Sequence, residues 1–203
     1  MLVETKTVQA TLLSAITWQV DPSKHEKPDS SDVAQALRET ERSEKRSLSA
    51  DAYPQLLGTW RLVFVSKAKK PSGQWIPSWV HIQITYKETT TPFKPVAVET
   101  PRFLGRVYNQ VQIGVLKLTL SGPTAFNPAN GILAFDFTRF TVELAERSLF
   151  SAPMGGGTQR EAEFYDLPLK QQAFFRFFWI TPQGIAARGK GGGLALWAKN
   201  NAG

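Results

Sequence analysis

The sequence predicts a mainly β fold, an antiparallel β-barrel preceded by an N-terminal helical segment. From Leu57 onward, apolar and polar residues alternate with a period of two in short runs, the pattern of strands with one solvated face. These runs number about eight to ten, and no strong helical pattern interrupts them, as is typical of a barrel or a sandwich. Upstream, the hydrophobic period is helical. We therefore divide the chain into residues 1–55, a helical segment with a linker, and residues 56–203, a barrel domain.

Two helices are expected in the N-terminal segment. Residues 5–19 form the first, because four apolar residues fall on one helical face: Val8, Leu12, Ala15 and Ile16. This helix ends at an Asp-Pro pair, and a polar linker follows. The second helix covers about residues 32–47. Its apolar face is narrow, so we expect it to lie on a surface: Val33, Ala36 and Leu37.

Strands are expected in at least five runs of the second segment: 58–66, 79–87, 115–121, 139–144 and 173–180. Phe135 and Phe137 have odd parity, whereas Phe140 in the following run has even parity. Because side chains alternate between the two faces of a strand, one residue near Thr138 must shift the register. A β-bulge is therefore predicted there.

A glycine-rich stretch at residues 185–197, IAARGKGGGLALW, raises the question of a phosphate-binding loop. Its spacing matches neither G-x-x-x-x-G-K-[ST] nor G-x-G-x-x-G, and both motifs must join a strand to a helix. Here the glycines separate two short apolar runs, where glycine permits the positive φ of a tight turn. We therefore interpret Gly189, Gly191 and Gly192 as structural residues of a β-hairpin.

The composition leaves few routes to catalysis. The chain of 203 residues has no cysteine and only two histidines, His25 in the linker and His81 on the polar face of a strand. This excludes disulfides and thiolate chemistry, and two isolated histidines make neither a Ser-His-Asp triad nor a metal site. The acidic run EAEFYD at residues 161–166 is expected to be a solvated loop. We expect a protein without catalytic residues or a metal.

The net charge of +7 is unevenly distributed. Residues 1–50 carry seven basic and eight acidic residues, whereas residues 51–203 carry seventeen and nine. Nine of the basic residues lie between Arg61 and Lys117, against two glutamates. Such a surface predicts salt-sensitive contact with an anionic membrane or an acidic protein. Nucleic acid is not expected as a partner, because the basic residues are spread along strands without a recognisable module.

Aromatic residues supply the candidate binding site. An eight-stranded barrel can hold one small ligand, and the chain has thirteen Phe, six Trp and four Tyr. The residues expected to line the ligand are Trp60, Phe64, Phe135, Phe137, Phe175, Phe177 and Trp179. The run 173–180 has too many aromatics for one face, so some must face outward. Arg188 is expected to pair with the polar end of a ligand or with Asp136, an acid embedded in a strongly apolar strand.

Three segments resemble the plastid lipid-associated protein, or fibrillin, family. Residues 56–66, LLGTWRLVFVS, look like the opening strand of the family and carry the G-x-W form seen in lipocalins. Residues 105–114, GRVYNQVQIG, resemble the central segment, and residues 185–197 resemble the closing strand-turn-strand. The similarity covers roughly residues 30–198. It departs from the family at residues 179–184, where WITPQG stands in place of a common Tyr-Leu-Asp.

The resemblance implies a lipocalin-like barrel in a cyanobacterium or a plastid. Because the N-terminus shows neither a signal peptide nor a transit peptide, we expect a cytoplasmic cyanobacterial protein at the thylakoid membrane, or a processed protein of the plastid stroma. Its function would be to bind a lipid, a quinone, a carotenoid or another isoprenoid, or a tetrapyrrole, without catalysis. Two alternatives stay open. One is an assembly factor or peripheral subunit of a photosynthetic complex, with a filled barrel; the other is a bilin chromophore lyase.

Overall fold

The computed structural model describes residues 2–43, 51–67, 70, 72–89 and 102–200, with side chains from Thr7 onward. The helices in this part of the chain are α1 (Leu2–Val20), α2 (Ser30–Ser43), α3 (Ala52–Leu56) and α4 (Gly157–Glu163). The strands are β1 (Gly58–Ser66), β2 (Gly73–Trp75), β3 (Val80–Glu88), β4 (Phe103–Ile113), β5 (Leu116–Asn127), β6 (Ile132–Phe135), β7 (Arg139–Leu144), β8 (Arg147–Pro153), β9 (Ala173–Ile180), β10 (Gly184–Gly189) and β11 (Leu194–Lys199). Two 3-10 turns precede β9: η1 (Phe164–Asp166) and η2 (Leu169–Gln171).

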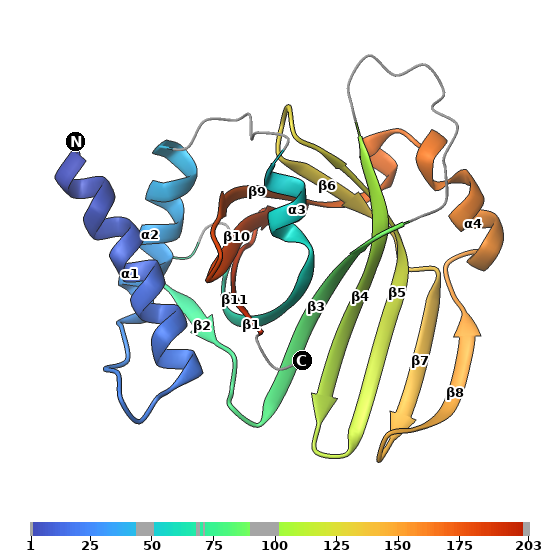
Figure 1. The fold of residues 1–203 in the computed structure, drawn as a ribbon, viewed down its shortest axis with the longest axis horizontal. Helices are drawn as coiled ribbons and strands as arrows, with labels where there is room; N and C mark the ends of the chain where they lie inside the picture. The colour runs from blue at the N-terminus through green and yellow to red at the C-terminus, as the bar shows by residue number, and fades with distance from the viewer. Residues whose placement is uncertain (1, 44–50, 68–69, 71, 90–101, 201–203) are drawn as a thin grey trace.

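Eight of the strands close into an antiparallel barrel (Figure 1). Around the barrel they follow the order β4-β3-β1-β11-β10-β9-β6-β5, and β5 pairs back with β4. Closure leaves no free edge within this ring, which removes the usual hazard of exposed strand edges. The predicted mainly β fold, a barrel with an N-terminal helical segment, is therefore confirmed.

Strand β5 pairs with two different strands along its length. Its first half pairs with β7, from Leu116 to Ser121, and its second half pairs with β6, from Thr124 to Asn127. Between β6 and β7 the chain leaves the ladder, and the Thr138 amide donates to the Ser121 carbonyl at 2.9 Å. This is the register break expected near Thr138. As a result β7 and β8 stay outside the ring and extend β3, β4 and β5 into a five-stranded sheet beyond one barrel mouth.

The helices α1 and α2 cover the outer wall of the barrel, on the side of β2, β9 and β11 (Figure 1). Their buried residues form one cluster with outward-facing side chains of the strands, among them Phe64, Phe178 and Leu196. Helix α2 turns Val33, Ala36 and Leu37 into this cluster and keeps its opposite face in solvent, as predicted. Residues 44–47 of the predicted second helix lie outside the described residues. Within the described part of the chain, no helix has the length and hydropathy needed to cross a membrane.

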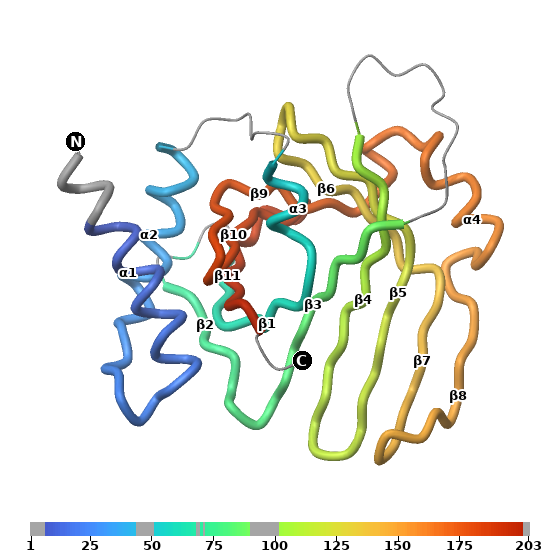
Figure 2. The backbone as a smooth tube through the Cα atoms, viewed as in Figure 1, coloured from blue at the N-terminus to red at the C-terminus, as the bar shows by residue number. Residues whose placement is uncertain are grey.

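Helix α3 lies across one end of the barrel, as the tube in Figure 2 shows. Tyr53 and Leu56 from this helix pack into the interior cluster with Trp60. The Trp60 indole Nε1 donates to the Leu56 carbonyl at 2.7 Å. Lys199 Nζ lies 4.1 Å from the centroid of the Trp60 ring and donates to the Leu57 carbonyl at 2.8 Å. These contacts close the α3 end of the barrel.

Helix α4 and turn η1 cover another part of the outer wall. Phe164 is fully buried there, in a small cluster with Ala125 of β5 and Ala134 of β6. The expectation of a solvated loop at residues 161–166 was therefore wrong. The run reads as acidic, yet its one phenylalanine packs against two small residues of the barrel wall and so anchors the segment.

Candidate functional site

The extended sheet of β3, β4, β5, β7 and β8 carries one apolar face. Cross-strand partners share a face, so the register defines it: Ile82, Val111, Leu118, Val142 and Phe150 form one row. Neighbouring rows add Val80, Ile113, Leu116 and Leu144 on one side, and Leu120 and Phe140 on the other. We call these eleven apolar residues the apron.

The apron continues the interior face of the barrel. Leu120 and Phe140 lie in the same cross-strand row as Asn109 and Ile84, and Ile84 belongs to the buried interior cluster with Trp60. One apolar surface therefore runs from inside the barrel, through its mouth, onto a sheet in solvent. Its outer members are exposed: Leu116 at 48%, Leu144 at 42% and Phe150 at 53%.

The opposite face of the same sheet is polar. Lys117 Nζ lies 3.0 Å from the Glu143 carboxylate, and the Thr141 and Ser151 hydroxyls are 3.1 Å apart. A sheet with one polar face and one apolar face normally buries the apolar one against another layer. The exposed fractions of the apron residues show that much of this face is uncovered here, which marks it as a contact surface.

Aromatic rings form the floor of the mouth. Phe135 stacks 5.1 Å from Phe175 and lies 5.3 Å from Phe137, and Phe175 meets Trp197 edge-on at 5.4 Å. Phe137 and Phe175 are only partly buried, whereas Phe135 is 7% exposed. Three of the phenylalanines predicted to line a ligand are thus brought together in one interior cluster.

The remaining predicted wall residues divide into two groups. Trp60 and Phe177 are buried in the interior, deeper than the mouth. Phe64 and Trp179 instead lie on the outer wall, under α1 and α2, and do not line the interior. The reason in each case is a register shift. One shift lies in β1, between Leu62 and Phe64. The other lies in the β9–β10 pair, where Ala187 is opposite Phe177 but Ala186 is opposite Trp179. A bulge reverses the alternation that parity assumes.

The α3 end of the interior is packed with side chains. Tyr53 stacks on Phe103 at 4.8 Å and on Phe126 at 5.8 Å, and its hydroxyl donates to the Leu104 carbonyl at 2.9 Å. Burial raises the pKa of Tyr53 to about 12. Tyr86, edge-on to Phe177 at 6.2 Å, has a buried hydroxyl for which the structure gives no hydrogen-bond partner among the described residues. Burial raises the pKa of Tyr86 well above its ordinary value.

Arg188 points outward to helix α2. Its Nε donates to Glu41 Oε1 at 2.7 Å, and its terminal nitrogens contact Glu41 Oε2 and the Gly192 carbonyl. Arg176 of β9 also pairs with Glu41. Burial alone would raise the pKa of Glu41, but the hydrogen bonds and charges of Arg188 and Arg176 outweigh it, so the pKa is lowered.

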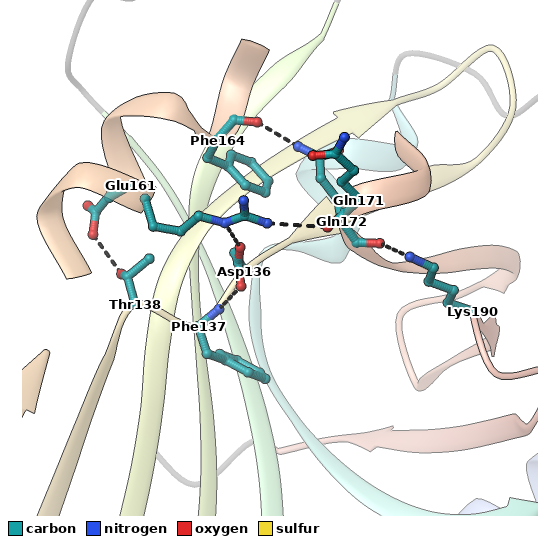
Figure 3. A network of polar contacts seen from close by, with 9 residues as sticks. Asp136, Phe137, Thr138, Glu161, Phe164, Gln171, Gln172 and Lys190 are labelled. Carbon is teal, nitrogen blue, oxygen red and sulfur yellow. Dashed lines mark hydrogen bonds and ion pairs between the residues drawn. The ribbon is translucent and has the colours of Figure 1, made fainter. Parts of the chain in front are cut away.

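Asp136 lies in the chain segment between β6 and β7, on the side of α4 (Figure 3). Arg160 Nε donates to its carboxylate at 2.7 Å, and the Phe137 amide donates to the same side chain at 2.9 Å. The predicted Asp136–Arg188 pair is therefore wrong. Each residue finds its partner on a helix that covers the barrel wall, and the sequence gives no register for those helices.

A polar network fixes the register break that places Phe137 at the mouth (Figure 3). Thr138 donates to Glu161 at 2.7 Å, and Glu161 also pairs with Arg106 of β4. Burial would raise the pKa of Glu161, but these partners lower it. Arg160 reaches on to the Gln171 carbonyl at 3.2 Å. The network thus anchors α4 to the segment that carries Phe137.

The glycine stretch forms a β-hairpin turn, as predicted. The Gly189 amide donates to the Gly193 carbonyl at 2.9 Å, and the Gly192 amide donates to the Gly189 carbonyl at 2.8 Å. Gly192 has φ +84°, whereas Gly189 and Gly191 do not have positive φ. Lys190 Nζ donates to the Gln172 carbonyl at 2.9 Å, so the lysine of the turn is engaged with β9 and the segment before it.

Seven of the basic residues between Arg61 and Lys117 are described, and four of them lie on the polar outer face of β1, β3, β4 and β5: Arg61, Lys87, Arg106 and Lys117. Lys117 is paired with Glu143 and Arg106 with Glu161, which offsets part of the positive charge. Lys87 lies 5.4 Å from the centroid of the Tyr108 ring. This face is opposite to the apron, so the charge and the apolar surface are on different sides of the sheet.

Two further observations concern other kinds of site. A pocket of about 250 Å³ lies outside the barrel, between α1 and the β9–β10 turn, with Leu13, Val20, Pro182 and Lys199 in its lining. Within the described ranges, no group of three or more His, Asp or Glu side chains is arranged to hold a metal ion.

The fold defines a class: a closed antiparallel β-barrel of the type common among binding proteins, here with an exposed apolar sheet face that continues its interior face. No family model, curated protein or solved structure matches the chain. The resemblance to the fibrillin family therefore stays a prediction from the sequence.

Proposed function

We propose that the protein binds an apolar small molecule, without catalysis, at the open mouth of the barrel. The observation that carries the proposal is the continuity between the barrel interior and the apron, with partly buried Phe137 and Phe175 at the junction. A ligand there would meet aromatic rings on the barrel side and aliphatic side chains on the sheet side. Ligand sites in proteins are mostly apolar and concave, and they favour the mouths of barrels.

The packing of the interior limits the depth of the site. Because Tyr53, Trp60 and Phe126 fill the α3 end, the ligand would lie at the mouth and over the apron rather than along the whole barrel axis. Nearby carboxylates are engaged: Asp136 with Arg160 and Glu161 with Arg106. This leaves apolar contacts as the main source of affinity, at about 25 cal/mol per Å² of apolar surface withdrawn from water.

The fibrillin resemblance supplies the chemical range of the ligand. Lipids, isoprenoids such as quinones and carotenoids, and tetrapyrroles all present the large apolar surface that the mouth and apron would cover. The setting at a thylakoid membrane, in a cyanobacterium or a plastid, rests on the same resemblance and belongs to the proposal.

A second function is favoured by one observation. The α3 end is filled by side chains, and much of the apolar surface lies outside the barrel on the apron. This arrangement also suits the interpretation as an assembly factor or peripheral subunit, in which a partner protein of a photosynthetic complex would cover the apron. The two functions differ in whether a free small molecule binds the isolated protein.

Fluorescence titration with cis-parinaric acid, which emits strongly only in apolar surroundings, tests the proposal. Phe175→Ser removes a ring from the mouth, and Phe174→Ser is the matched control, because Phe174 is the adjacent residue of β9 and packs on the outer wall. We expect saturable binding that Phe175→Ser weakens about tenfold and Phe174→Ser leaves unchanged, since burying a Phe side chain is worth about 1.5–3 kcal/mol. Absence of saturable binding to the folded protein, or equal losses in both variants, would contradict the proposal.

A further inference from the structure

Three separate turns gather exposed apolar residues at one end of the extended sheet. They are the loop before β3, the β4–β5 hairpin and the β7–β8 hairpin, which lie side by side at the lower edge of the molecule in Figure 1. Their exposed apolar side chains are Trp79, Ile113, Val115, Leu116, Leu144 and Leu149, which we call the tip row. Trp79 and Val115 are each 64% exposed and Leu149 is 62% exposed. Trp79 and Val115 lie in two of these turns, and Leu149 lies in β8 two residues beyond the start of that strand. Turn positions usually carry polar residues, so exposed apolar side chains gathered at one end of a sheet indicate a contact surface.

Two backbone amides and three backbone carbonyls at these turns have hydrogen-bond partners within the protein. The Ala145 amide of one hairpin donates to the Val115 carbonyl of the other at 2.9 Å. Gln112 Nε2 donates to the Gly114 carbonyl at 3.1 Å, and the Val80 amide donates to the Pro77 carbonyl at 3.1 Å. Backbone groups that enter a lipid environment must find partners inside the protein. These five groups of the three turns meet that condition.

The charge at the tip row is balanced. Glu146 in the β7–β8 turn is followed by Arg147, and Lys117 beside Leu116 is paired with Glu143. This surface therefore favours neither an acidic nor a basic protein partner. Tryptophan, with an apolar ring and one polar N–H, favours the boundary between acyl chains and headgroups.

We infer that the tip row inserts into the surface of a lipid bilayer, through apolar contacts rather than through charge. Three turns at one level can contact a flat surface at the same time. A bilayer offers such a surface, and its lipids can adapt to separate side chains. Three residues belong to both the tip row and the outermost row of the apron, so insertion would bring that row into the membrane surface: Ile113, Leu116 and Leu144. The inference does not depend on the proposed ligand: it concerns the turns, and it holds whether or not the mouth binds a small molecule.

The absence of cysteine makes the test direct, since a single cysteine can be introduced and labelled with an environment-sensitive fluorophore. Val115→Cys places the label in the tip row, and Gln159→Cys places it on exposed α4 as the control. With phosphatidylcholine vesicles we expect a blue shift for the label at 115 and quenching by spin-labelled lipid, unchanged between low and high salt. We expect neither effect at 159. Emission typical of water at both positions, or equal shifts at both, would overturn the inference.

A second variant separates insertion from general surface stickiness. Trp79→Ser, Val115→Ser and Leu149→Ser combined change only exposed side chains, so the fold is expected to stay intact. Vesicle partitioning should fall at least about tenfold, whereas binding of cis-parinaric acid should persist. Vesicle partitioning equal to that of the parent protein would contradict the inference. A blue shift at 115 that depends on protein concentration without vesicles would also overturn it, because it would show a second copy of the chain on this surface.

Discussion

Glu41 of α2 and Arg188 of β10 are 147 residues apart in the sequence and meet in an ion pair, with Arg188 Nε 2.7 Å from Glu41 Oε1. The Glu41 side chain is only 9% exposed, and Arg176 contacts it from the neighbouring strand. This contact joins the N-terminal helical segment to the barrel wall beside the C-terminal hairpin.

The pair should be energetically coupled. Glu41→Gln and Arg188→Ala should each lower the free energy of unfolding by about 1–3 kcal/mol, because each leaves a partly buried charged group without its partner. The double variant should lose clearly less than the two single losses added together. Urea unfolding of the four proteins measures the coupling. Additivity within about 0.5 kcal/mol would show that the contact contributes nothing, and the same cycle on Arg188 and Asp136 should be additive.

Acid should weaken the attachment of both α2 and α4. The pKa values of Glu41 and Glu161 are lowered in the folded protein from an ordinary value of 4.5. Their stabilising contribution is therefore present above that value and is lost as the pH falls below it, toward the folded pKa. Unfolding measured from about pH 7 to about pH 3 should show this loss, and Glu41→Gln should have a shallower decline. Glu163→Gln, an exposed carboxylate of α4, is the control and should follow the parent protein.

The glycine turn should discriminate between two neighbouring positions. Gly192 has φ +84°, where a side chain is strained, so Gly192→Ala should cost about 1–2 kcal/mol. A Cβ on Gly191 would meet nothing within 4 Å and Gly191 does not have positive φ, so Gly191→Ala should change the unfolding free energy little. Thermal unfolding of the two variants compares them. Equal effects would contradict the steric interpretation of the turn.

The two buried tyrosines should respond in opposite directions to loss of the hydroxyl. Tyr86→Phe removes a buried hydroxyl for which the structure gives no partner, and it should raise the unfolding free energy by about 1 kcal/mol. Tyr53→Phe removes the hydrogen bond to Leu104, and it should lower that energy by about 0.5–1.5 kcal/mol. Denaturant midpoints of both variants give the signs. A destabilised Tyr86→Phe would show that this hydroxyl is satisfied in the protein in solution.

The sequence predicted local features of the fold better than contacts between distant segments. The bounds of β1, β7 and β9 agree with the predicted runs, because alternation along a strand is a property of the run itself. Parity placed Phe64 and Trp179 on the wrong side, since it cannot show a bulge. The partners of Arg188 and Asp136 depend on where α2 and α4 pack, which no local pattern contains.

The apron was visible in the sequence only in part. The alternation of residues 79–87, 115–121 and 139–144 predicted one apolar face on each strand, and the structure joins these faces through the cross-strand register. What alternation does not reveal is whether another layer covers such a face. The apolar residues at turn positions, Trp79 and Val115, were the signal for an uncovered end, because turn chemistry normally selects polar residues there.

Methyl-resolved NMR of the 22.6 kDa protein tests the binding site at the barrel mouth most directly. During titration with cis-parinaric acid, the methyl resonances of Ile82, Val111 and Leu118 on the apron should shift and saturate together. Those of Leu37 and Leu194, in the cluster between the helices and the outer wall, should stay unchanged. No shift at saturating ligand, or shifts confined to Leu37 and Leu194, would contradict a ligand site at the mouth.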